Sequence, residues 1–147
     1  MRIREHFKIK GHLVITVTDI DGNVTRQFEV PNTVVNTGKN YIASRMVGTA
    51  SPVMSKMAIG TSSVAPDVTN IGLLGQLAIV DMSNFAAVDN VITATAAFPP
   101  ETGIGLITEA GIFDNSVTPV MLCRTTFPVV NKTSLDGVSI SWTITVS

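Results

Sequence analysis

The sequence predicts an all-β protein: an antiparallel β-sandwich, of the jelly-roll or immunoglobulin-like kind, with one short α-helix around residues 37–47. Three observations support this prediction. Several segments alternate apolar and polar residues with period two, turn residues recur at roughly ten-residue intervals, and a single segment has helical spacing. We expect six to eight short strands in one domain covering residues 1–147.

The first predicted element is a β-hairpin over residues 12–30. In "HLVITVT" the apolar Leu13, Ile15 and Val17 share one face, which is the pattern of a half-buried strand. The following "DIDGN" contains the Asp-Gly pair typical of tight turns, because glycine adopts positive φ without a steric penalty. The returning strand "VTRQFEV" ends at a proline.

The helix is predicted from "NTGKNYIASRMVG". Asn36 or Thr37 can cap its free N–H groups, and Gly48 is placed to end it. Further strands are predicted within residues 53–60, 90–98 and 118–127, and residues 61–72 are rich in loop formers.

The last strand, "VSISWTITVS", has the most regular alternation in the chain. Trp142 lies on its apolar face with Val138, Ile140, Ile144 and Val146, and we expect this face in the core. Every position between them is Ser or Thr. Such an uncharged face meets water or, at a sheet edge, accepts a neighbouring strand, so the pattern favours assembly into an oligomer.

Composition points the same way. The chain has 147 residues, of which 45% are hydrophobic and 14% charged, against about 25% charged in a typical soluble domain. No apolar run reaches the ~18 residues that a membrane helix needs, and no secretory signal is visible. The single cysteine excludes an intramolecular disulfide. We expect synthesis in a reducing cytoplasm and no membrane partner.

The charges are segregated along the chain. Residues 1–56 carry eight Lys or Arg and four acids, whereas residues 57–147 carry two bases and seven acids. Either the fold interleaves the two halves, or neighbouring subunits meet through complementary charge. Residues 1–10 are predicted to form a basic N-terminal arm containing Arg2, Arg4, Lys8 and Lys10. No aromatic stacking platform accompanies the arm, so nucleic-acid binding is not expected.

The sequence offers no catalytic constellation. A nucleophile elbow, a P-loop and a G-x-G-x-x-G motif are all missing, and His6 and His12 have no neighbouring ligands to complete a metal site. Cys123 lies among apolar residues and is predicted to be a buried packing thiol. We therefore expect no enzyme activity, no catalytic or metal-binding residues and no cofactor.

Glu109 is the most informative carboxylate, because it stands between two hydrophobic runs in "GIGLITEAGIFDN". A buried carboxylate without a partner is costly. Arg124, on the following predicted strand, is the candidate partner.

Several motifs occur in an order that resembles the N-terminal domain of bacteriophage tail-collar fibre proteins. They are "NTGKNYIA", "MAIGTS", "TNIGLLGQLA", "FPPETG" and "ITEAGIFDN" followed by "PVMLCR", together covering about residues 34–124. The strongest is Glu109-Ala110-Gly111-Ile112-Phe113-Asp114. Relative to that family, the hairpin of residues 12–30 is an addition.

The resemblance implies a non-enzymatic structural protein of a tailed-phage virion, made in the bacterial cytoplasm. It would act as a tail, collar or baseplate adaptor or as a fibre-anchoring module, docking as an oligomer to tail, baseplate, portal-proximal or capsid subunits. Two alternatives are capsid decoration and a host-surface carbohydrate-binding module. Besides the basic arm, the docking residues are predicted in the "PPETGIG" turn: Pro99, Pro100, Glu101, Gly103 and Gly105.

Overall fold

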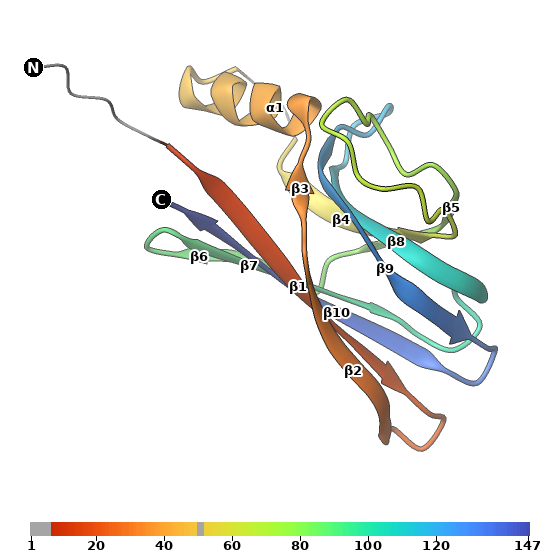
Figure 1. Cartoon of the computed structure of the whole chain (residues 1–147). Helices are drawn as coiled ribbons and strands as arrows, with labels where there is room; N and C mark the ends of the chain where they lie inside the picture. Colours follow the sequence, from red (N-terminus) through yellow and green to blue (C-terminus); the bar gives the residue numbers. More distant parts are fainter. Residues whose placement is uncertain (1–6, 50–51) are drawn as a thin grey trace, which may run out of the picture.

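The computed structural model describes residues 7–49 and 52–147 and is a β-sandwich of two five-stranded antiparallel sheets with one short helix. The helix lies at one end of the sandwich, beside β3 (Figure 1). The predicted fold class is confirmed.

Sheet A has the strand order β2-β1-β10-β7-β6. Its strands in that order are Val24–Pro31, Ile9–Thr18, Gly137–Val146, Val91–Phe98 and Asn84–Val88. The predicted hairpin is present as β1 and β2, and Gly22 in its turn has a φ of 83°. Because β1 also pairs along its whole length with β10, the hairpin is an integral part of the sheet.

Sheet B has the strand order β3-β9-β8-β4-β5. Its strands in that order are Thr33–Val34, Met121–Lys132, Gly105–Asp114, Met54–Gly60 and Gln76–Asp81. Helix α1, Asn36–Met46, follows the two-residue strand β3.

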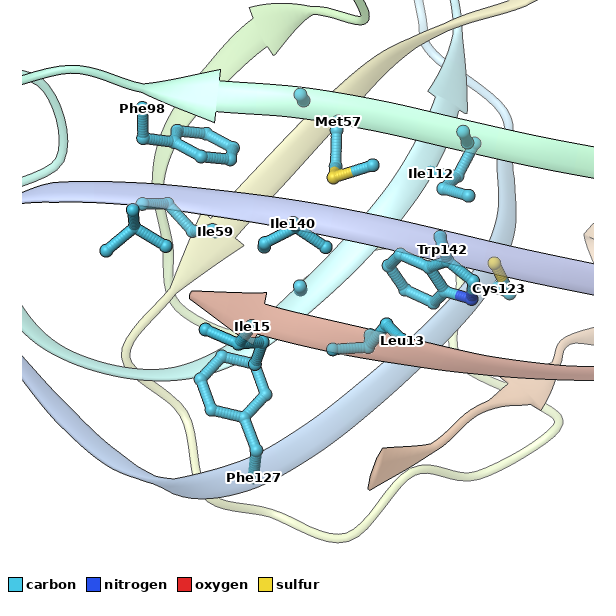
Figure 2. Close-up of a cluster of buried hydrophobic side chains, with 14 of the residues drawn as sticks. Leu13, Ile15, Met57, Ile59, Phe98, Ile112, Cys123, Phe127, Ile140 and Trp142 are labelled. Atoms are coloured by element: carbon cyan, nitrogen blue, oxygen red, sulfur yellow. The ribbon is translucent and has the colours of Figure 1, made fainter. Parts of the chain in front are cut away.

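The core lies between the two sheets and contains Trp142, which is fully buried (Figure 2). Trp142 pairs with Leu13 on one side and with Ala94 on the other, so the large indole has a small neighbour in its own sheet. The predicted inward face of the last strand is confirmed at Val138, Ile140, Trp142 and Ile144.

Three expectations need correction. The described residues form ten strands rather than six to eight, because β3 is very short and β5 and β6 do not alternate apolar and polar residues. The helix begins without a side-chain cap: Val35 occupies the N-cap position, and Thr37 Oγ1 instead donates to the carbonyl of Met121 at 2.8 Å. Gly48 follows the helix in the expected left-handed conformation, with a φ of 76°.

The last correction concerns β10, whose uncharged Ser/Thr face suggested an edge strand. It is the central strand of sheet A, paired with β1 and β7. A neighbouring subunit therefore has no access to its backbone.

Candidate functional site

The predicted partnership between Glu109 and Arg124 is present in the structure. Arg124 Nε donates to Glu109 Oε1 at 3.1 Å, and both side chains are fully buried. Glu109 belongs to β8 and Arg124 to β9, which are adjacent in sheet B.

Glu109 also accepts three hydrogen bonds from backbone amides outside the sheet. Glu109 Oε2 accepts from the amides of Ser62 and Gly75, each at 2.8 Å, and Oε1 accepts from the amide of Leu74 at 2.9 Å. One carboxylate therefore binds both ends of the segment between β4 and β5. Four donors compensate the burial of its charge.

Arg124 binds the middle of the same segment. Its two terminal nitrogens donate to the carbonyl of Val64 at 2.9 Å and to Asn70 Oδ1 at 3.1 Å. The fixed fork of the guanidinium group suits three acceptors in different directions. We call residues 61–75 the covering loop, and the Glu109–Arg124 pair with its bonds the clamp.

The covering loop lies over the outer face of sheet B and closes a second, small apolar cluster there. Leu73 packs against Val35, Ala58, Phe113 and Met121. This cluster explains why β8 is buried on both faces from Glu109 to Asp114, and why its sequence is apolar rather than alternating.

Close approach at the clamp requires a glycine in β4. A Cβ atom on Gly60 would lie 2.5 Å from the carbonyl oxygen of Gly75 and 2.8 Å from Glu109 Oε2. Both distances are too short for a methyl group, so Gly60 provides the space in which the carboxylate meets the loop.

The predicted docking turn lies partly on the surface. Pro99, Pro100 and Glu101 are exposed, whereas Gly103 and Gly105 are half-buried. Glu101 has a φ of 74°, a left-handed conformation that is unfavourable for a residue with a side chain. The turn closes with a hydrogen bond from the amide of Thr102 to the carbonyl of Pro99 at 3.1 Å.

A buried lysine forms a hydrogen bond to this turn. Lys132, fully buried at the end of β9, donates from Nζ to the carbonyl of Pro99 at 2.9 Å. Burial lowers the pKa of Lys132, and the nearby carboxylates of Asp136 and Glu101 oppose that shift. The sequence contained a signal for this residue, because Lys132 is in period-two phase with the buried Val130.

The predicted basic arm is only partly described. Arg2 and Arg4 lie outside the described residues. Lys8 and Lys10 are exposed but belong to paired backbone: Lys8 exchanges two hydrogen bonds with Ser147, at 2.7 and 2.8 Å, and Lys10 lies in β1 opposite Thr145. The range of the arm therefore needs correction, since its last residues extend sheet A.

Asp114 and Cys123, the other two residues considered as possible functional groups, have structural roles. Asp114 accepts hydrogen bonds from Ser116 and from the amide of Val120, which shapes the turn between β8 and β9. Cys123 is fully buried, as predicted, and burial raises the pKa of its thiol to about 12. Neither residue contacts the clamp through a side-chain hydrogen bond.

Within residues 7–49 and 52–147, no group of three or more His, Cys, Asp or Glu side chains could hold a metal ion. The same part of the chain contains no helix with the length and apolar character needed to cross a bilayer.

The clamp's loop partners were not identified from the sequence. Ser62, Asn70 and Leu74 lie in a segment with no periodicity, and three of the four bonds to Glu109 use backbone amides, which leave no trace in residue identity. Comparisons with protein-family models, with curated proteins and with solved structures found no match.

Proposed function

We propose that this protein is a non-enzymatic structural component of a tailed-phage virion that docks to other virion subunits. Its place would be the tail, collar or baseplate, as an adaptor or fibre-anchoring module. The observation that carries the proposal is the clamp, because it assigns a single structural task to three of the five motifs on which the resemblance rests.

Those motifs are separate in the sequence and adjacent in space. "MAIGTS" contributes Gly60 and Ser62, "TNIGLLGQLA" contributes Asn70 and Leu74, and "ITEAGIFDN" contributes Glu109. Because residues from these separate motifs meet in one buried network, the motifs work together to form one part of the fold. This supports treating the motifs as parts of one structural unit, which is how the proposed fibre-anchoring role uses them.

The bonding of the clamp also favours docking over catalysis. Glu109 accepts four hydrogen bonds, and each nitrogen of the Arg124 guanidinium group has an acceptor. A catalytic carboxylate must reach a substrate, and these two side chains are fully buried under the covering loop. They act by holding a surface in shape.

The copy number of the protein in purified phage particles tests this proposal. Quantitative mass spectrometry against the major capsid protein should give roughly 6 to 18 copies for a ring or fibre set with closed cyclic symmetry. Hundreds of copies would instead indicate capsid decoration. Absence from purified particles would contradict a virion role altogether.

The docking surface can be tested in the same particles. Truncation of residues 1–6 removes Arg2 and Arg4 without changing any described strand, and Glu101→Ala removes the exposed carboxylate of the turn. We expect each variant to fold normally and to be incorporated less efficiently. Asp21→Ala, which removes an exposed carboxylate from the turn of the β1–β2 hairpin, is the matched control. Equal incorporation of all variants would exclude both surfaces from docking.

A further inference from the structure

Strand β6 is an open edge of sheet A. All five of its residues, Asn84–Val88, are exposed, including Phe85 at 37% and Val88 at 74%. In the part of the chain that the structure describes, β6 pairs with β7 alone. In Figure 1 the hairpin of these two strands extends to the side of the sandwich away from β2.

The other sheet edges carry features that discourage pairing with another chain. Edge strand β2 contains Arg26, Glu29 and Pro31, and Arg26 also donates to the carbonyl of Val129 on β9. Edge strand β3 has only two residues. Edge strand β5 is next to a bulge in its pairing with β4 and ends at Asp81, which pairs with Lys56 at 2.6 Å. Charge, proline, very short length and bulges are the usual protections of an edge, whereas the five residues of β6 include no charge and no proline and pair with β7 without a bulge.

The distribution of charged residues across sheet A shows that β6 lacks the charged side chains expected of an edge strand. Strands β10, β7 and β6 contain no Asp, Glu, Lys or Arg, and the charged residues of the sheet are confined to β1 and β2. A sheet normally has its uncharged strands in the interior. The sequence of β6 therefore has the character of an interior strand whose second neighbour comes from elsewhere.

We propose that this neighbour is β6 of a second copy, joined antiparallel about a two-fold axis at Ala86. The two copies would then share a ten-stranded sheet whose outer strands are the two protected β2 edges. This dimer contact is additional to the docking role proposed above. Because it can be measured with the purified protein and without virions, the two proposals can be tested separately.

The backbone of β6 offers hydrogen-bonding groups in the matching positions. Val88 and Val91 flank the two-residue turn of the β6–β7 hairpin, so they form its first hydrogen-bonded pair, and Ala86 with Thr93 forms the next. The intervening Phe85 and Ala87 direct their N–H and C=O groups away from β7. A two-fold axis at Ala86 sets Phe85 opposite Ala87 of the partner subunit, which satisfies the groups of both.

The side chains are compatible with the same register. Ala86 meets Ala86 of the partner subunit, and small side chains suit the narrow non-hydrogen-bonded pair. Asn84 meets Val88 of the partner subunit. Asp89, just beyond the strand, meets Ser83 of the partner subunit, so no like charges face one another. Pairing would also cover part of the exposed surface of Phe85 and Val88.

Sedimentation of the purified full chain over a concentration series is the first experiment. We expect a monomer–dimer equilibrium. Ala87→Pro removes an N–H that points away from β7, so it blocks pairing between copies while the β6–β7 ladder stays intact. It should weaken the dimer roughly tenfold or more, because about four hydrogen bonds cross the axis. A cooperative unfolding transition, followed by Trp142 fluorescence at a concentration where the wild type is also monomeric, confirms that the variant is folded.

If the proline variant does not fold, variants with opposite charges at position 86 still test the proposed dimer. Ala86→Lys and Ala86→Glu should each be monomeric, since each variant sets like charges across the axis. Mixing the two should restore a dimer that contains one of each. Gln27→Lys, on the exposed edge strand β2, is the matched control and should dimerise like the wild type.

Cross-linking tests the register. Ala86→Cys should form a disulfide between two copies under mild oxidation, because residues in a non-hydrogen-bonded pair are within disulfide range. The native Cys123 is fully buried and should not compete. Gln27→Cys should not cross-link. A wild type that sediments as a monomer at all concentrations, a trimer, or a dimer that persists in Ala87→Pro and in both charge variants would overturn the proposal.

Discussion

At the residue scale, the loss of Arg124 would leave Glu109 with hydrogen-bond donors but without a counter-charge. Glu109 keeps three backbone donors when Arg124 is lost, but its negative charge then lies buried without a cation. Breaking a buried pair from one side costs about 3–5 kcal/mol, far more than the pair contributes relative to apolar packing. Asn70 Oδ1 and the carbonyl of Val64 would lose their donor as well.

We predict that Arg124→Ala lowers the free energy of unfolding by roughly 3–5 kcal/mol in urea titrations. Lys56→Ala is the control: it breaks the more exposed Lys56–Asp81 pair and should cost about 1 kcal/mol or less. If Arg124→Ala and Lys56→Ala have the same small effect, the clamp does not stabilise the fold.

Cys123 provides a pH dependence whose sign follows from burial. The thiol has an ordinary pKa of 9.0 in the unfolded chain and a pKa of about 12 in the core. The thiol is protonated in both states well below pH 9.0, so it has no effect on stability there. As the pH rises from 9.0 toward 12, the unfolded thiol ionises and the folded thiol does not, which stabilises the unfolded state.

We predict that the wild type loses about 1.4 kcal/mol more stability than Cys123→Ala between about pH 8 and about pH 10. The difference between the two proteins isolates the thiol, because the other groups whose pKa burial shifts, Tyr41 upward and Lys132 downward, are present in both. Parallel stability curves for the two proteins over this range would show that the thiol is accessible to water in the folded state.

At the scale of elements, the covering loop depends on the absence of a side chain in β4. Gly60→Ala would place its methyl group against Glu109 Oε2 and the carbonyl of Gly75, so either the strand or the loop must move. We predict a loss of roughly 1–3 kcal/mol, the usual cost of overpacking, together with faster proteolysis within residues 61–75.

Gly72→Ala is the matched control for this prediction. Gly72 lies in the same loop, and a Cβ atom there would meet nothing within 4 Å. It should leave both stability and proteolysis unchanged. Equal proteolysis of the two variants would indicate that the loop is not held through Gly60.

At the scale of the whole molecule, the hairpin β1–β2 cannot be separated from the sandwich. Strand β1 covers one side of the central strand β10 and supplies Leu13, Ile15 and Val17 to the core. A chain that lacks residues 1–33 should therefore fail to unfold cooperatively, whereas a chain that lacks residues 1–6 should keep the wild-type transition. Circular dichroism and Trp142 fluorescence measure both. A cooperative transition without the hairpin would restore its interpretation as an addition to a complete domain.

Local pattern determined much of this architecture. Period-two alternation identified β1, β7 and β10 and placed Trp142 inward, because a strand with one buried face must segregate its side chains. The Asp-Gly turn and Gly48 marked the ends of their elements for equally local reasons, since both require positive φ. The partnership of Glu109 with Arg124 could also be predicted, because a carboxylate between apolar runs needs a cation.

Only the tertiary structure decided the order of the strands and the path of the covering loop. Alternation reports which residues are buried but not which strand lies beside which, so β10 could be the centre of sheet A and β6 its edge without any change in pattern. Backbone amides hold Glu109, and every residue except proline has one, so sequence does not reveal which amides converge. Lys132 shows the same limit: its phase indicated burial, but its acceptor is the carbonyl of a distant proline that only folding brings near.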